Sequence, residues 1–154
     1  MSVTRIALGT LSLAAALTLA PHAHAADACK LEISGNDLMQ YDKQELSVPA
    51  SCQEVTLTLH HSGKLSKDAM GHDWVLMLTP DLNAVAQAGL SAGSAENYVQ
   101  PGDKRVIAHT KVIGGGESTS VTFSTAGLKP GGDYSYECTF PGHSALMKGK
   151  FKFC

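Results

Sequence analysis

The pattern of apolar and polar positions beyond residue 29 is typical of short β-strands. Residues 30–34 and 55–60 alternate polar with apolar side chains, and residues 74–78 are continuously apolar, which predicts strands in the first half of the chain. The second half repeats the pattern and adds four predicted strands, at residues 105–113, 120–124, 134–138 and 148–153. Glycine-containing turns separate these segments. The fold class is therefore predicted to be all-β, with a Greek-key sandwich or barrel.

One segment interrupts the β pattern. After Asp81, apolar residues recur from Leu82 to Leu90 at spacings of three and four, which is the spacing of a helix face. Asp81 stands directly before the first of them and is a candidate N-cap. We expect one short helix on the outside of the sandwich, with Leu90 leading toward the loops at one end and a loop at residues 91–95.

The first 25 residues differ in composition from the rest of the chain. Arg5 is followed by an apolar stretch from Ile6 to Leu19 and then by small residues up to Ala25. This order predicts a secretory signal peptide, residues 1–25, that is cleaved after Ala25 during export. The apolar stretch is shorter than the roughly 20 residues of a membrane span, and no membrane span is predicted later. Residues 26–154 have the length of one domain.

The charge balance argues against a nucleic-acid partner. The whole chain has 12 basic and 14 acidic residues, so losing Arg5 with the signal peptide leaves a net charge of about −3 with histidines neutral. No basic field is available to hold phosphates. Lys148, Lys150 and Lys152 alternate along the last predicted strand, and we expect them to form a solvated face that keeps an exposed strand unpaired.

Candidate metal chemistry is concentrated near the C-terminus. Cys138, His143 and Met147 lie within ten residues, and a second imidazole, His72, lies upstream. Two imidazoles, one thiolate and a weakly bound thioether are the ligand set of blue-copper electron-transfer sites. These four residues are therefore the candidate ligands of one copper ion.

Strand geometry explains how these side chains can converge. If residues 134–138 form a strand, alternation points Cys138 into the core and Glu137 outward. The Pro-Gly pair at 141–142 then turns the chain, so that His143 and the rest of the ligand loop return to the same point. His72 must arrive from another strand.

The ligand set favours an electron carrier over a catalyst, because it leaves no open position for a substrate or water. An enzymatic Cys-His nucleophile pair lacks a third residue placed to orient the histidine. Structural zinc is disfavoured, because a thioether is a poor zinc ligand and closely spaced cysteine pairs are absent from the sequence. A copper storage or delivery protein is the second class, but such proteins usually rely on exposed methionine or histidine clusters.

Four cysteines in a small exported chain favour at least one disulfide, and they permit three complete pairings. If Cys138 is a ligand, then Cys29, Cys52 and Cys154 remain. Cys29 with Cys52 is the economical pair and closes a loop of about two dozen residues. Cys154 is then left at the C-terminus, where it either links two copies into a dimer or stays free.

Four segments carry a family resemblance, and they lie at residues 35–37, 70–76, 105–111 and 138–149. The last reads Cys-Thr-Phe-Pro-Gly-His-Ser-Ala-Leu-Met-Lys-Gly and is the most specific. In these segments the chain resembles the azurins, which are bacterial periplasmic cupredoxins, and the likeness covers essentially the whole mature chain. The resemblance implies a cupredoxin fold for residues 26–154, a periplasmic location, and one-electron transfer between respiratory partners through one type 1 (blue) copper.

The resemblance also assigns roles to particular residues. It implies equatorial ligation by His72, Cys138 and His143, axial ligation by Met147, a distant contact from the Gly71 carbonyl, and a disulfide between Cys29 and Cys52. The electron would leave at the exposed edge of His143 through an apolar docking patch made of Met39, Met70, Leu90, Phe140 and Leu146. The implied partners are c-type cytochromes and copper nitrite reductase.

Two other histidines and one tryptophan receive weaker assignments. By resemblance, His61 lies near the copper and modulates it, although a buried structural histidine is an equal reading. His109 is expected at the surface beside the docking patch. Trp74 is expected in the core.

Three positions depart from the azurin pattern. Asp73 stands where azurins carry Asn, and an ionised carboxylate there would favour Cu(II) and lower the reduction potential. Glu137 stands where azurins often carry an aromatic residue, and as an outward side chain it should affect copper little. The third departure is Cys154 as the final residue.

Overall fold

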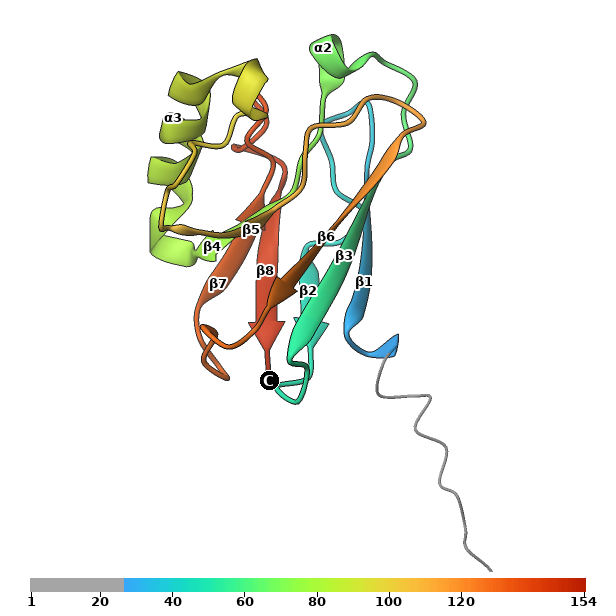
Figure 1. The fold of residues 1–154 in the computed structure, drawn as a ribbon. Coiled ribbons are helices and arrows are strands. Elements are labelled where there is room, and N and C mark those ends of the chain that lie inside the picture. Colours follow the sequence, from blue (N-terminus) through green and yellow to red (C-terminus); the bar gives the residue numbers. More distant parts are fainter. Residues whose placement is uncertain (1–26) are drawn as a thin grey trace, which may run out of the picture.

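The computed structural model describes residues 27–154, so the predicted signal peptide, 1–25, lies outside the described residues. The described chain forms two facing sheets with a helix beside them (Figure 1). Its strands are β1 (Lys30–Gly35), β2 (Glu45–Val48), β3 (Glu54–His61), β4 (Val75–Leu78), β5 (Val106–His109), β6 (Ser118–Ser124), β7 (Tyr134–Glu137) and β8 (Lys148–Phe153). The all-β prediction is confirmed.

The strand order brings distant parts of the chain together. One sheet has the order β1-β3-β6, and the other has the order β2-β8-β7-β4-β5. β1 runs parallel to β3, and β2 runs parallel to β8, whereas the other neighbours are antiparallel. The last strand in sequence therefore lies inside its sheet, between β2 and β7. No helix among the described residues is long and apolar enough to span a membrane.

The main core lies between the two sheets and is built around Trp74, which is fully buried. Its ring centre lies 6.1 Å from that of Phe123, 5.8 Å from that of Tyr136 and 6.5 Å from that of Phe151. Buried aromatic side chains of this size are worth about 3–5 kcal/mol each against alanine. The prediction that Trp74 is a core residue is confirmed.

The predicted external helix is α3 (Leu82–Ala92), and it follows a 3₁₀ turn, η1 (Thr79–Asp81). Asp81 makes no side-chain capping bond and has right-handed helical angles, because the 3₁₀ turn runs directly into α3. The capping prediction for Asp81 was therefore wrong. Val85 of α3 clusters with Val75 and Met77, which places the helix over the outer face of the five-stranded sheet.

Several boundaries differ from the sequence predictions. The expected loop at 91–95 instead contains the end of α3 and the start of a second 3₁₀ turn, η2 (Ser94–Glu96). The sequence interpretation missed β2 and a single helical turn, α2 (Lys67–Met70). The strand expected at 105–113 ends at His109, and Ile113 forms an isolated bridge to His72.

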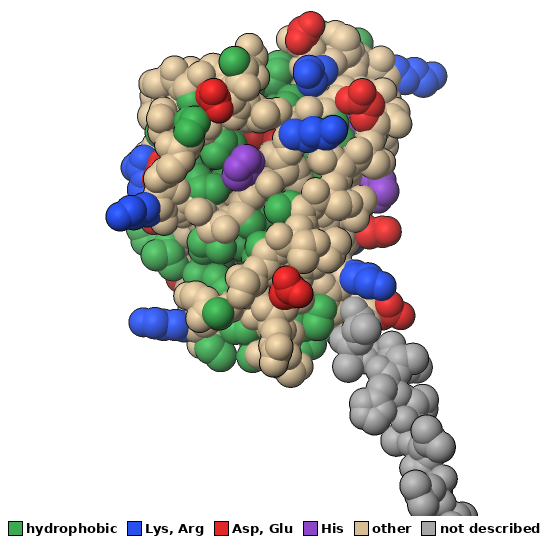
Figure 2. Space-filling view, viewed as in Figure 1, with side chains coloured by type: hydrophobic (Ala, Val, Ile, Leu, Met, Phe, Trp, Pro, Cys, Tyr) green, Lys and Arg blue, Asp and Glu red, His purple; other side chains and the backbone are tan. Residues whose placement is uncertain are grey.

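The lysines of β8 are exposed, as predicted, but β8 is not an unpaired strand. Lys150 pairs with Asp133 and Lys152 with Glu45, with nitrogen–oxygen distances of 2.8 Å in each case. Figure 2 shows side chains of both charges scattered over the face in view, with apolar side chains between them. This face has no continuous basic field of the kind that binds nucleic acid.

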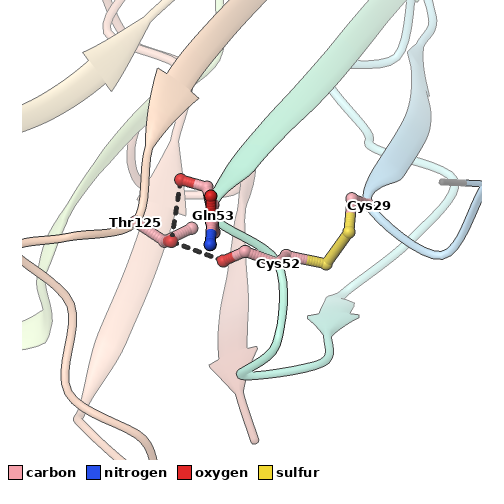
Figure 3. The surroundings of a disulfide bond; sticks show 4 residues. All are labelled: Cys29, Cys52, Gln53 and Thr125. Atoms are coloured by element: carbon pink, nitrogen blue, oxygen red, sulfur yellow. Dashed lines mark hydrogen bonds between the residues drawn. A yellow bond between two sulfur atoms is a disulfide. The ribbon is translucent and has the colours of Figure 1, made fainter. Parts of the chain in front are cut away.

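A disulfide joins Cys29 and Cys52, which confirms the expected pairing (Figure 3). The two residues stand just before β1 and β3, which pair in parallel. Thr125 donates its hydroxyl proton to the Cys52 and Gln53 carbonyls, at 2.5 and 3.0 Å. A crosslink spanning 23 residues stabilises the fold by roughly 3 kcal/mol in the chain-entropy model.

Candidate metal centre

Three of the predicted ligands converge at one end of the sandwich. His72, Cys138 and His143 are buried, and their donor atoms all lie within 4.8 Å of one another. His72 stands shortly before β4, and Cys138 directly follows β7, the antiparallel neighbour of β4. The strand pairing therefore brings His72 and Cys138 together, and the loop between β7 and β8 adds His143.

The His72 ring is oriented for a ligand. Its Nε2 atom donates a proton to the Asn36 carbonyl at 2.8 Å, which leaves the lone pair on Nδ1. Nδ1 is buried and has no hydrogen-bond partner in the described chain. Because a buried polar atom without a partner is costly, this atom indicates a site for an electron-pair acceptor such as a metal ion.

The ligand loop is held by its own hydrogen bonds. The Cys138 amide donates to the Met147 carbonyl at 2.9 Å, and the Met147 amide donates to the His143 carbonyl at 2.8 Å. Gly142 has a φ of +81°, which suits glycine at the turn. The Cys138 sulfur consequently lies 3.6 Å from Nδ1 of His143 and 4.0 Å from the Gly71 carbonyl oxygen.

Met147 is fully buried beside the same site. A Cβ atom added at Gly35 would lie 2.6 Å from Cδ2 of His72 and 3.1 Å from Cε of Met147. Gly35 therefore gives both side chains the space they occupy. The sequence interpretation used Gly35 only as part of a motif, and this packing role has no signal in the local pattern.

Burial controls the protonation of the three donors in the metal-free protein. Desolvation lowers the pKa of His72, and desolvation together with the neighbouring His72 lowers the pKa of His143 to about 4. Both imidazoles are therefore neutral near pH 7 and can coordinate a metal. Desolvation raises the pKa of the Cys138 thiol. Metal binding must displace that proton, which makes metal affinity rise with pH.

Asp73 links β4 to the ligand loop. Its buried carboxylate accepts a hydrogen bond from the Thr139 amide at 2.8 Å and another from the Thr139 hydroxyl at 2.5 Å. Burial raises the pKa of Asp73 to about 6, although the two bonds from Thr139 oppose that rise. Asp73 therefore accepts hydrogen bonds from the ligand loop through both of its carboxylate oxygens.

Glu137 corrects a sequence prediction. Its side chain is only 2% exposed, although strand alternation predicted an outward position. Helix α3 covers the outer face of this sheet, so all four residues of β7 are buried. Oε1 of Glu137 is buried without a hydrogen-bond partner in the described chain, and desolvation raises the pKa of Glu137 to about 8.

His61 is buried and stacks on His72, with ring centres 4.2 Å apart. Its Nε2 atom donates to the Met70 carbonyl at 2.7 Å, and its Nδ1 atom accepts from the Gly63 amide at 3.1 Å. Both ring nitrogens are thus engaged with backbone. The structure therefore gives His61 two backbone hydrogen bonds and one stacking contact with His72. His109 is exposed, as predicted.

The residues of the predicted docking patch differ in exposure. Leu146 is 65% exposed and Leu90 is 44% exposed, whereas Met39 and Met70 are half-buried. Phe140 is buried, with its ring centre 4.7 Å from that of His143. The sequence interpretation missed a further exposed residue, Leu38, which lines one hollow together with Met39 and Leu146.

A family model described as "Copper binding proteins, plastocyanin/azurin family" matches residues 27–153. The chain belongs to the plastocyanin/azurin family. It is 54% identical over 124 residues to azurin-1 of Alcaligenes xylosoxydans xylosoxydans, a match that covers 80% of this chain and 96% of that protein. It is 50% identical over 121 residues to the azurin of Pseudomonas aeruginosa, with coverages of 79% and 82%.

A solved azurin has the same cupredoxin fold. The structure of the azurin Az-iso2 from the methylotroph Methylomonas sp. strain J aligns with a TM-score of 0.79 and 45% identity, over 82% of this chain and 98% of that chain. Cupredoxins of this family bind one type 1 copper and carry electrons rather than catalyse reactions. The predicted copper cofactor, the electron-transfer class and the prediction that the protein is not an enzyme are therefore confirmed. The buried Nδ1 atom, which has no partner among residues 27–154, lies beside a thiol and a second imidazole and fits that metal.

Proposed function

We propose that this cupredoxin is a periplasmic one-electron carrier whose copper is held by four side chains and approached by one carbonyl. His72, Cys138 and His143 would be the equatorial ligands, Met147 would be the weak axial ligand, and the Gly71 carbonyl would be a distant contact opposite Met147. The observation that carries this proposal is the buried Nδ1 of His72, which has no partner within the described chain, in a residue whose donor group lies within 4.8 Å of those of Cys138 and His143. When bound there, copper supplies a couple that gains and loses one electron.

The protein's contribution is rigidity. The Asn36 carbonyl orients His72, and the hydrogen bond from the Cys138 amide to the Met147 carbonyl closes the ligand loop. Asp73 ties the residue after Cys138 to the start of β4. Since these hydrogen bonds join protein groups to one another, the donors would need little rearrangement when the charge of the site changes, which favours fast electron transfer.

We further propose that electrons leave and enter near His143, through the docking patch of Met39, Met70, Leu90, Phe140 and Leu146. The proposed partners are c-type cytochromes and copper nitrite reductase. Support comes from the two exposed leucines of this patch and from the contact between Phe140 and His143. A modest apolar surface suits short-lived redox encounters.

The proposal includes processing and assembly. Cleavage after Ala25 would leave residues 26–154 as the mature cupredoxin domain in the periplasm, a location that agrees with the disulfide. Cys154 is an exposed free thiol, so two copies can be joined through it in an oxidising compartment. His61 and Asp73 are proposed to modulate the copper, because one stacks on His72 and the other binds the ligand loop.

The decisive experiment is the visible spectrum of the mature protein after addition of Cu(II). The two free cysteines of the described chain provide a matched pair of variants. We expect intense red-region absorption that is bleached by a reductant, lost in Cys138→Ser and retained in Cys154→Ser. If Cys138→Ser keeps the absorption, or the parent protein never shows it, the ligand assignment is wrong.

Voltammetry separates a carrier from a copper-delivery protein. A carrier should cycle repeatedly between Cu(I) and Cu(II) in the presence of a Cu(I) chelator without losing metal. Release of copper to the chelator after one reduction would instead identify a delivery protein and contradict the carrier role.

A further inference from the structure

The segment after α3 holds an aromatic residue in an unusual backbone conformation. Asn97 and Tyr98 both have φ values of +54°, in the left-handed region. Asparagine is tolerated there, but a bulky aromatic residue is a genuine outlier and persists only when its surroundings fix it. Outliers of this kind gather at functional sites.

Three contacts fix this conformation. The Tyr98 amide donates to the Gly93 carbonyl at 3.0 Å, and the Asn97 side-chain oxygen accepts from the Val112 amide at 3.0 Å. On the other side, α3 packs directly against the Tyr98 carbonyl. A Cβ atom at Gly89 would lie 2.0 Å from that oxygen, so glycine is required for the helix to come this close. Tyr98 is therefore anchored to elements outside the ligand loop.

The Tyr98 ring packs on the metal centre's surroundings. It meets Phe140 edge-on, with ring centres 5.3 Å apart and an interplanar angle of 75°. Phe140 in turn lies 4.7 Å from the ring of His143, centre to centre. The three rings form a continuous series of contacts from the segment after η2 to a proposed ligand, and Tyr98 packs against the small cluster that includes Cys138 and Met147.

We infer that Tyr98 is a positioning residue for His143. Held in place by α3 and by Asn97, its ring supports Phe140, and Phe140 limits the orientations open to the His143 imidazole. The ligand loop's own hydrogen bonds fix its backbone, whereas these ring contacts fix the imidazole ring of His143. The inference rests on the proposed function only in taking His143 as a copper ligand.

The test compares three variants. Tyr98→Leu removes the ring, and Tyr98→Phe keeps the ring and removes only the hydroxyl. Gly89→Ala leaves the tyrosine chemically unchanged but displaces its carbonyl, and with it the residue. The readouts are NMR line widths of the His143 ring protons in the metal-free protein, the copper hyperfine splitting in the EPR spectrum, and the electron self-exchange rate. Thermal unfolding establishes that each variant is measured while folded.

We expect Tyr98→Leu and Gly89→Ala to broaden the His143 ring signals, change the hyperfine splitting and lower the self-exchange rate by roughly tenfold, as small displacements of reacting groups do. Tyr98→Phe should match the parent protein in all three. The inference would be overturned if Tyr98→Leu folds and keeps the His143 ring signals and the hyperfine splitting of the parent protein. It would also be overturned if Tyr98→Phe behaves like Tyr98→Leu. If Tyr98→Leu does not fold, Gly89→Ala decides the question by the same criteria.

Failure of the proposed function would look different. A parent protein without thiolate–copper absorption would remove the ligand assignment, while the NMR comparison in the metal-free protein would still report whether Tyr98 orders the His143 ring.

Discussion

Replacing Glu137 with Gln tests how much its ionisation destabilises the folded protein. Glu137 is 2% exposed and its Oε1 atom has no partner in the described chain, so ionisation places a negative charge among apolar groups. Burial raises its pKa from 4.5 to about 8, which at about 1.4 kcal/mol per pKa unit corresponds to roughly 5 kcal/mol. Relaxation and entering water reduce such costs, so we expect about 2–5 kcal/mol.

The sign of the effect follows from proton binding in the two states. Below pH 4.5 the carboxyl is protonated in the folded and the unfolded protein, and it contributes no pH dependence. Between pH 4.5 and about 8 the unfolded chain releases the proton while the folded chain keeps it, so the free energy of unfolding falls as pH rises. Above that range both states are ionised, and the full loss of stability is present.

The assay is urea unfolding of the metal-free protein at pH 5 and pH 9, for the parent and for Glu137→Gln. The variant should resemble the parent at pH 5 and exceed its free energy of unfolding by about 2–5 kcal/mol at pH 9. Other titrating groups are common to both proteins and largely cancel in the difference. Glu54→Gln, at an exposed position of β3, is the matched control and should give no pH-dependent difference. Equal stability of parent and Glu137→Gln at pH 9 would refute the burial argument.

Three further outcomes are expected. Asp73→Asn should raise the reduction potential, by roughly 100 mV for the loss of a nearby unit charge, and an unchanged or lower potential in voltammetry would contradict its proposed role. Gly35→Ala should destabilise the protein by about 1–3 kcal/mol and weaken copper binding, because the new Cβ would lie 2.6 Å from the His72 ring. Thermal unfolding and copper titration measure the two effects, and Gly127→Ala, whose Cβ would enter open space, is the control. Non-reducing electrophoresis should show a dimer that Cys154→Ser removes, and a monomer with a second free thiol besides the Cys138 thiol would exclude that link.

Local sequence patterns predicted the parts of the fold that depend on local physics. Strand alternation located β1, β3 and β8, and the three-and-four spacing located α3, because each signal is contained within its own element. The ligand loop was predictable for the same reason, since its turn and its donors lie within ten residues. The position of Met147 beside Cys138 follows from the antiparallel pairing of the two strands that flank the loop.

What could not be predicted depends on contacts between distant segments. Glu137 is buried because α3, some fifty residues earlier in the chain, covers its face of the sheet, and no alternation pattern carries that information. Asp81 failed as a cap because a 3₁₀ turn continues into the helix. The support that Tyr98 gives to Phe140 likewise requires the arrangement of α3 in space.

The place of β8 inside its sheet has a consequence for the order in which the molecule is assembled. Among the described strands β8 comes latest in the chain, yet it bridges β2 and β7, so the five-stranded sheet stays split until residues 148–153 have been synthesised. The ligand loop is closed by the same late strand. A growing chain that ends before residue 148 therefore lacks the strand that closes the copper pocket, so assembly of the pocket has to wait for β8 to pair.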